Sequence, residues 1–169
     1  MCRLSGLCVT VSSTLRLTDH MKPIRNSIKA VIIRDHHVLL IKNIDKDGFW
    51  YVFPGGGQNA GEDMVAALRR ECFEETGISI SVGPLRLVRE YIGKNHEFPE
   101  SDGDVHQVEL YFECGLVSGS EPKNGEMKDA NQVDVEWVSL DCLGSVRVYP
   151  KLFQKGLDDF QTIYVGDVN

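Results

Sequence analysis

The stretch GGQNAGEDMVAALRRECFEETGI, residues 56–78, decides the fold. Residues 62–76 are all compatible with an α-helix that has acidic residues in its first turn, and Gly77 follows where a left-handed C-terminal cap is expected. On a helical wheel three residues form an apolar stripe: Val65, Leu68 and Cys72. This stretch therefore predicts a glycine-rich loop followed by one amphipathic helix that packs against a sheet.

Three glutamates make this helix electrostatically unfavourable. Glu71, Glu74 and Glu75 include pairs three and four residues apart, and such like-charge pairs destabilise a helix by about 0.2–0.5 kcal/mol each. All three lie near the negative end of the helix dipole, which costs about 0.3–1 kcal/mol per carboxylate. A hard divalent cation removes both penalties, because it prefers carboxylate oxygens. The pattern predicts Mg²⁺, with Mn²⁺ as a substitute; the alternative is solvated glutamates relieved by Arg69 and Arg70.

Strand patterns flank the helix on both sides. Residues 28–33 and 38–41 predict a β-hairpin, and an aromatic strand over residues 50–53 ends at Pro54. Further strands are expected over residues 78–82, 85–91, 108–116 and 133–138. Residues 118–132 are polar and predict a loop, and residues 149–160 have helical spacing after Pro150. Strand runs without regular βαβ alternation indicate an α+β domain with a mixed sheet between helices.

Composition limits the class of protein. The 169 residues are 42% hydrophobic, which is typical of one globular domain, expected over residues 21–169. Residues 1–20 are expected to form a flexible extension; serine and threonine interrupt their apolar residues and argue against a secretion signal. The net charge of −7 argues against binding to a nucleic acid polymer or an anionic membrane. Five cysteines without CxxC spacing favour a reducing cytoplasmic location.

Residues 56–78 resemble the Nudix box, the signature of the MutT-like Nudix hydrolase superfamily. Its seven fixed identities are all present: Gly56, Glu62, Arg70, Glu71, Glu74, Glu75 and Gly77. Cys72 stands where the family usually has an aliphatic residue, and a buried thiol behaves as a small hydrophobe. The aromatic strand before Pro54 and the strand at residues 136–138 also look like the family. The resemblance implies a Nudix-type α/β/α sandwich with a central mixed β-sheet.

The same resemblance implies a Mg²⁺-dependent pyrophosphohydrolase. Such an enzyme cleaves the phosphoanhydride bond of a nucleoside diphosphate linked to another moiety, in an NTP, a dNTP or an NDP-sugar. The implied metal ligands are Glu71, Glu74, Glu75 and a backbone carbonyl of Gly55 or Gly56, and these two glycines also adjoin the substrate. The resemblance assigns Arg70 to orienting the glutamates through charge-assisted hydrogen bonds. Glu62 supports that network or simply stabilises the helix start.

The sequence offers candidates for the general base and for the residues that contact substrate. Relatives take the general base from the box or from a downstream loop, which makes Glu126 a candidate, against the alternative of a solvated loop acid. Lys42 resembles a basic residue that some relatives place against substrate. The aromatic residues of 50–53 either stack on a base or belong to the core. A non-catalytic nucleotide-sensing module is the competing function, and a homodimer is an expected assembly. The negative charge disfavours removal of RNA caps.

Overall fold

The structure, a computed structural model, describes residues 22–157 and 163–169; the predicted flexible extension lies outside these ranges. Its elements follow in this order: β1 (Arg25–Arg34), β2 (His37–Asp45), β3 (Gly48–Val52), α1 (Met64–Thr76), β4 (Ile80–Ile92), η1 (Gly93–Asn95), α2 (Pro99–Asp102), β5 (His106–Leu116), β6 (Gln132–Ser139), η2 (Leu140–Ser145), β7 (Val148–Tyr149), η3 (Lys151–Lys155) and β8 (Tyr164–Asp167). Elements labelled η are 3₁₀ helices. The predicted strands and the loop between β5 and β6 are thereby confirmed, whereas β7 and β8 were not predicted.

The sheet is mixed, as predicted, and it opens between β1 and β2. Its strand order is β7-β3-β2-β1-β5-β4-β8, with β6 paired to β2. β1 runs parallel to β5 from Arg25 to Ile32, but it pairs with β2 only through two residues next to the turn. In the part of β1 farther from the turn, the edge that faces away from β5 pairs with the glycine-rich loop instead. There Ile28 N–H donates to the Gly56 carbonyl at 2.8 Å. The divergence of two adjacent strands therefore makes room for this loop.

Helix α1 starts two residues later than predicted. Asp63 is the N-cap residue, and its side chain accepts a hydrogen bond from Ala66 N–H at 2.8 Å. At the other end Gly77 has φ 65°, which confirms the left-handed cap. Leu68 and Cys72 are fully buried, but Val65 is 37% exposed, so its place in the apolar stripe was predicted wrongly. The buried face is shifted around the helix toward residues 67 and 76, where the sheet lies.

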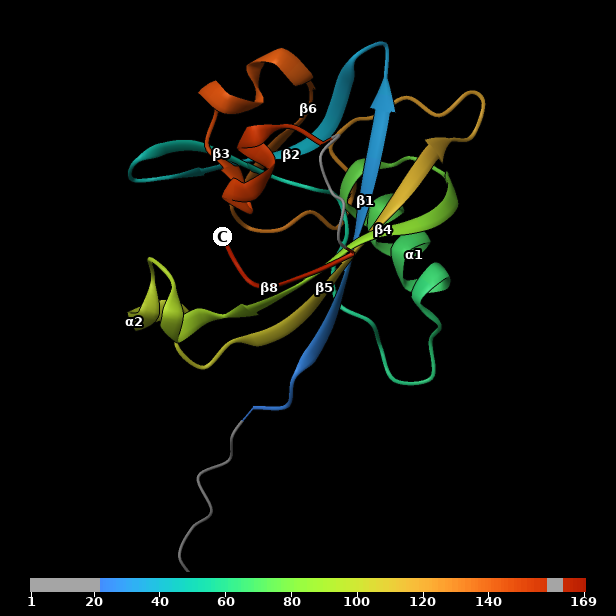
Figure 1. Ribbon diagram of the computed structural model, residues 1–169. Helices are drawn as coiled ribbons and strands as arrows, with labels where there is room; N and C mark the ends of the chain where they lie inside the picture. The colour runs from blue at the N-terminus through green and yellow to red at the C-terminus, as the bar shows by residue number, and fades with distance from the viewer. Residues whose placement is uncertain (1–21, 158–162) are drawn as a thin grey trace, which may run out of the picture.

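Two hydrophobic layers cover opposite faces of the sheet. α1 packs Ala67, Leu68 and Cys72 against one face, while η2 and η3 cover the other face (Figure 1). In the second layer the ring of Phe153 lies 4.5 Å from Phe53 and 5.1 Å from Tyr111, centroid to centroid. The α/β/α arrangement thus holds, with 3₁₀ helices as its second helical layer.

The predicted C-terminal helix over residues 149–160 was wrong in type and length. The chain forms the 3₁₀ helix Lys151–Lys155 and then leaves it at Gly156, which has φ 110°. Only five residues separate Pro150 from Gly156, too few for more than a short helix. Residues 158–160 of the predicted helix lie outside the described part of the chain.

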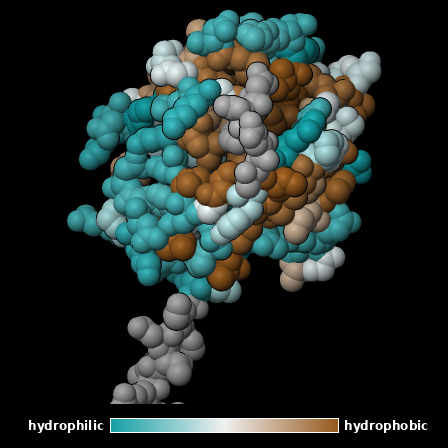
Figure 2. Space-filling model, viewed as in Figure 1, coloured by the Kyte–Doolittle hydropathy of each residue, from teal (hydrophilic) through white to brown (hydrophobic). Residues whose placement is uncertain are grey.

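The two strands predicted over residues 78–82 and 85–91 form the single strand β4. Its ladder with β5 is irregular between Val82 and Leu87, where Pro84 has no N–H to donate. On the face seen in Figure 2, hydrophobic residues gather at the centre and hydrophilic residues cover the left and the top. Among the residues that the structure describes, no helix is long and apolar enough to cross a membrane.

Candidate active site

The glycine-rich loop lies close against β1. Ala30 N–H donates to the Pro54 carbonyl at 2.8 Å, and Ser27 forms an isolated bridge with Gly57. Gly55 has φ 126°, and a Cβ atom added there would lie 2.1 Å from the Ile28 carbonyl oxygen. This position therefore needs glycine both for its conformation and for the close approach of two backbones.

A cavity of about 440 Å³ lies between this loop, the end of α1 and the diverging strands. Its lining includes the carboxylates Glu71, Glu75 and Asp129, the cations Arg25 and Lys29, the backbone of residues 55–57, and Trp50. Of the residues predicted to form the site, four line this cavity: Gly55, Gly56, Glu71 and Glu75. The sheet and the helix therefore bring together acidic and basic groups that are far apart in sequence.

Arg70 joins the acidic residues of the box into one network. Its guanidinium binds Glu62 through two N–H groups, each at 2.9 Å. A third nitrogen contacts Glu71 at 2.8 Å and Glu74 at 3.1 Å. These hydrogen bonds raise the pKa of Arg70, with Glu62 as the largest cause, and they lower the pKa of Glu62. The contacts match the orienting role that the resemblance implies for Arg70, and they give Glu62 a place in the same network.

Glu71 and Glu75 hold their carboxylates against the glycine-rich loop. A Cβ atom on Gly56 would lie 2.5 Å from the Glu71 carboxyl carbon, so that carboxylate sits directly over the glycine. Glu75 accepts a hydrogen bond from Gly55 N–H at 2.8 Å. Burial raises the pKa of the Glu75 carboxyl to about 7, opposed by the nearby charge of Lys29 and by the bond from Gly55. The fold thus keeps a carboxyl group where its ionised form lacks solvent.

The chemistry of these donors fits a hard divalent cation. Within the described residues, one oxygen of Glu71 and one of Glu75 accept no hydrogen bond, and both carboxylates lie beside the Gly55–Gly56 backbone. Across residues 22–157 and 163–169, however, no three acidic, histidine or cysteine side chains converge as a metal-binding group. Arg70 accounts for this, because it holds Glu74 and one oxygen of Glu71 on its guanidinium.

The loop between β5 and β6 caps the C-terminal end of α1. Three backbone N–H groups donate to helix carbonyls that have no partner within the helix: Lys123 to Thr76, Gly125 to Glu75 and Met127 to Glu74. The amide of Gln132 also donates to the Glu75 carbonyl, at 2.9 Å. These donors offset part of the unfavourable negative charge noted for this helix end. They also fix the course of the loop relative to the cavity.

Two predicted site residues lie elsewhere. Glu126 and Asp129 both sit on this capping loop with exposed side chains, but only Asp129 lines the cavity. Lys42 does not line it either. Ile41 and Asn43 face the cavity, and alternate residues of a strand point to opposite sides, so Lys42 points away. Its ammonium group bonds Glu136 at 2.5 Å and lies 4.2 Å from the centre of the Phe49 ring.

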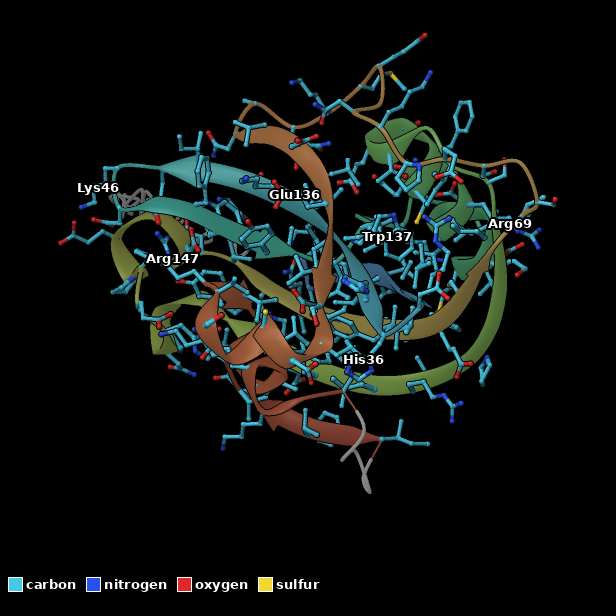
Figure 3. All side chains as sticks on the ribbon, turned by 90° about the horizontal axis from the view of Figure 1, so that it is seen from above. His36, Lys46, Arg69, Glu136, Trp137 and Arg147 are labelled. Carbon is cyan, nitrogen blue, oxygen red and sulfur yellow. The ribbon has the colours of Figure 1, made fainter. Side chains whose placement is uncertain are left out.

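Figure 3 shows Glu136, the partner of Lys42, and Trp137 on opposite sides of β6. Side chains also alternate between the two sides of β3, which separates the aromatic residues before the glycine-rich loop into core residues and a cavity residue. Tyr51 and Phe53 belong to the core beneath η3, and Trp50 faces the cavity.

Cys72 is buried, and burial raises the pKa of its thiol, which agrees with a packing role rather than a nucleophilic one.

Sequence reasoning missed Lys29 and Asp129 as cavity residues. The Lys29 ammonium donates to the Gly55 carbonyl, and its charge lowers the pKa of Glu75. Asp129 acts in the opposite direction and raises that pKa. A lysine inside an otherwise apolar strand run, residues 28–33, was the signal available for the first. No local signal distinguished Asp129 from the other acids of its loop.

Comparison with known proteins adds a family match. The profile of the NUDIX domain matches residues 23–156. An RNA pyrophosphohydrolase of Pelagibacter ubique is 34% identical over 104 residues, 60% of this chain and 49% of that protein. Nucleoside diphosphate-linked moiety X motif 6 of Mus musculus is 28% identical over 112 residues, 65% of this chain and 32% of that protein. The matched regions thus span less than half of each of these two relatives.

Solved structures share the fold. A NUDIX hydrolase from Nitrosomonas europaea superposes with a TM-score of 0.63 at 23% identity, covering 79% of this chain and 85% of that one. At this identity the likeness supports the architecture of the sheet and helices alone.

Proposed function

The chain belongs to the Nudix superfamily, and on this basis we propose that it is a metal-dependent pyrophosphohydrolase. The proposed substrate is a nucleoside diphosphate linked to another moiety, as in an NTP, a dNTP or an NDP-sugar. Mg²⁺ is the proposed cation, with Mn²⁺ as a substitute. The observation that carries the proposal is the meeting of Glu71 and Glu75 over the Gly55–Gly56 backbone in a cavity that also holds Lys29.

The chain's own residues supply three parts of this activity. Glu71 and Glu75, with a carbonyl of the glycine-rich loop, would hold the cation, and Glu74 would join them on leaving Arg70. A bound divalent cation supplies neutralisation of the phosphate oxygens and activation of water. Lys29 and Arg25 give the cavity positive charge for the diphosphate. Arg70 keeps the glutamates in position from outside the cavity.

A nucleotide panel tests the proposal. Purified protein is incubated with NTPs, dNTPs, NDP-sugars and a 5′-triphosphorylated RNA oligonucleotide, with Mg²⁺, with Mn²⁺ and with a chelator. The expected result is release of phosphate or pyrophosphate products from at least one mononucleotide class only when a divalent cation is present. Cation-independent release, or no release from any member, would contradict the proposal.

The same panel also tests two other functions, a non-catalytic nucleotide sensor and an enzyme that acts on RNA. The non-catalytic sensor predicts nucleotide binding without turnover, and the intact set of box glutamates argues against it. The RNA substrate is included because the Pelagibacter ubique relative is named an RNA pyrophosphohydrolase. The net charge of −7 opposes binding of a long polyanion, so we expect mononucleotides to be preferred over the RNA oligonucleotide.

For the general base we propose Asp129 in place of Glu126. Both side chains are exposed, but Asp129 lines the cavity and interacts electrostatically with Glu75, whereas Glu126 does not line the cavity. Asp129→Asn is expected to lower kcat about 10²- to 10⁴-fold, the usual contribution of a positioned base. Glu126→Gln, a neutralisation on the same loop, is the matched control and should leave kcat within about twofold, as for most exposed loop acids. Steady-state kinetics of both variants would reverse the assignment if Glu126→Gln proved the slower enzyme.

A further inference from the structure

Gln132 connects two residues to which the proposed function gives the central chemistry. It is the first residue of β6 and is 2% exposed. Its backbone N–H donates to the Asp129 carbonyl at 3.0 Å, and its side-chain amide donates to the Glu75 carbonyl at 2.9 Å. One buried residue is therefore bonded both to the proposed general base and to a proposed ligand of the cation.

A bulge between β2 and β6 aims Gln132 at α1. The ladder pairs Lys42 with Asp134, and the next pair is Asn43 with Gln132, so Val133 is an extra residue. Residues directly opposite in a ladder have side chains on the same face, and Asn43 faces the cavity. Without the bulge Val133 would stand opposite Asn43, and Gln132 would turn to the other face. The bulge thus brings the amide of Gln132 to the end of the helix.

The partners of this amide fix its orientation. A backbone carbonyl can only accept, so the group that meets the Glu75 carbonyl is the amide nitrogen. The same nitrogen donates to Asn124 Oδ1 at 3.2 Å, and Asn124 donates to the Val133 carbonyl at 2.9 Å. The amide oxygen of Gln132 is buried and accepts from no group in the described part of the chain. The side chain is held through its donor, at the cost of a buried acceptor without a partner.

These bonds fix the segment that carries Asp129. The Glu75 carbonyl accepts from Gly125 N–H and from the Gln132 amide, each at 2.9 Å, so it joins the two ends of that segment. A Cβ atom on Gly125 would lie 1.9 Å from the Glu74 carbonyl oxygen, so the segment rests directly on the helix end. The Asp129 carboxylate forms no hydrogen bond or ion pair with residues 22–157 or 163–169. Its place at the cavity therefore depends on how the backbone of this segment is held.

We propose that Gln132 is a positioning residue that holds the Asp129 carboxylate at the cavity, beside Glu75. This inference rests on the proposed function and deepens it, since it adds a residue that acts on the reaction only through the general base. Gln132 does not line the cavity itself. A displacement of about 1 Å of a reacting group can lower a rate about 10²-fold, so a residue in this position affects turnover without touching substrate.

Gln132→Met keeps the length of the side chain and removes both polar groups of the amide. On the panel substrate with the highest turnover, kcat is expected to fall about 10- to 100-fold. KM and the Mg²⁺ concentration for half-maximal activity should stay within about twofold, because Gln132 bonds the carbonyl of Glu75 and not its carboxylate. An unchanged kcat, or a loss that appears in KM alone, would overturn the inference.

Thr76→Val is the matched control for loss of a buried hydrogen bond at the same helix end. Thr76 is fully buried, and its hydroxyl donates to the Cys72 carbonyl within α1, away from the segment that carries Asp129. Its kcat is expected to stay within about twofold of the unaltered protein, whatever its melting temperature. An equal fall of kcat in Thr76→Val and Gln132→Met would mean a general effect of the helix end and would refute a specific role for Gln132.

A double variant tests whether Gln132 acts through Asp129. If it does, adding Gln132→Met to Asp129→Asn should slow the enzyme by no more than about a further twofold, because the carboxylate that Gln132 positions is already gone. Losses that multiply in the double variant would show that the two residues act independently.

Hydrogen exchange measured without substrate or cation separates this inference from the proposed function. The amides of Lys123, Gly125 and Met127, which donate to α1, are expected to exchange about tenfold faster in Gln132→Met and unchanged in Thr76→Val. Equal exchange in Gln132→Met and the unaltered protein would contradict the inference, even in an active enzyme. A protein that hydrolyses nothing contradicts the proposed function, and its exchange rates still decide whether Gln132 holds the segment.

Discussion

Glu75→Gln is expected to lower the cation-dependent kcat/KM about 10³-fold or more. The glutamine keeps the size of the side chain and can still accept the hydrogen bond from Gly55 N–H, but it removes the negative charge. Loss of about 4 kcal/mol of transition-state stabilisation, the scale of a metal contribution of several kcal/mol, corresponds to this factor. Steady-state kinetics on the panel substrate with the highest turnover measure it.

Stability measurements separate this loss from unfolding. Burial raises the pKa of the Glu75 carboxyl to about 7, so the fold disfavours the ionised form when no cation is bound. A neutral amide is therefore not expected to lower the melting temperature in chelator. Mg²⁺ should raise the melting temperature of the unaltered protein and raise that of Glu75→Gln much less.

Glu100→Gln provides the control for loss of one charge. Glu100 is exposed on α2, away from the cavity, and its replacement should change neither turnover nor the response to Mg²⁺. Full activity of Glu75→Gln, together with an undiminished thermal shift in Mg²⁺, would remove Glu75 from the proposed site.

Gly55→Ala is expected to destabilise the protein by more than about 4 kcal/mol. The added methyl group would lie 2.1 Å from the Ile28 carbonyl oxygen, and both sides of that contact are backbone, which has little room to move. Strain at φ 126° adds to the cost. For a chain of this length the melting temperature should fall by more than about 8 °C, measured by circular dichroism or calorimetry.

Gly48→Ala separates the clash from the strain. Gly48 has φ 108°, close to that of Gly55, but a Cβ atom added there meets nothing within 4 Å. Backbone strain alone is expected to cost about 1–2 kcal/mol, or about 2–8 °C. If the two alanine variants melted at the same temperature, the close approach of the glycine-rich loop to β1 would not be a stabilising feature of this fold.

Local sequence patterns determined the elements around the box. The 3.6-residue period, the glycine at position 77 and the run ended by Pro54 predicted α1 and β3 to within two residues, because caps and proline act on their immediate neighbours. The concentration of like charge in residues 71–75 also predicted a functional site at the helix end, since that repulsion is local. Local patterns failed for residues 149–160, where the chain forms the 3₁₀ helix Lys151–Lys155 and leaves it at Gly156, which has φ 110°.

Only the tertiary structure decided which polar residues share the cavity. The divergence of β1 from β2 makes room for the glycine-rich loop and brings Lys29 into contact with it. The alternation of side chains along β2 directs Lys42 toward Glu136. The capping of α1 fixes the loop that presents Asp129 rather than Glu126. Each of these choices depends on strand pairing and packing between segments far apart in the chain. Periodicity and composition along one segment carry no information about such pairings.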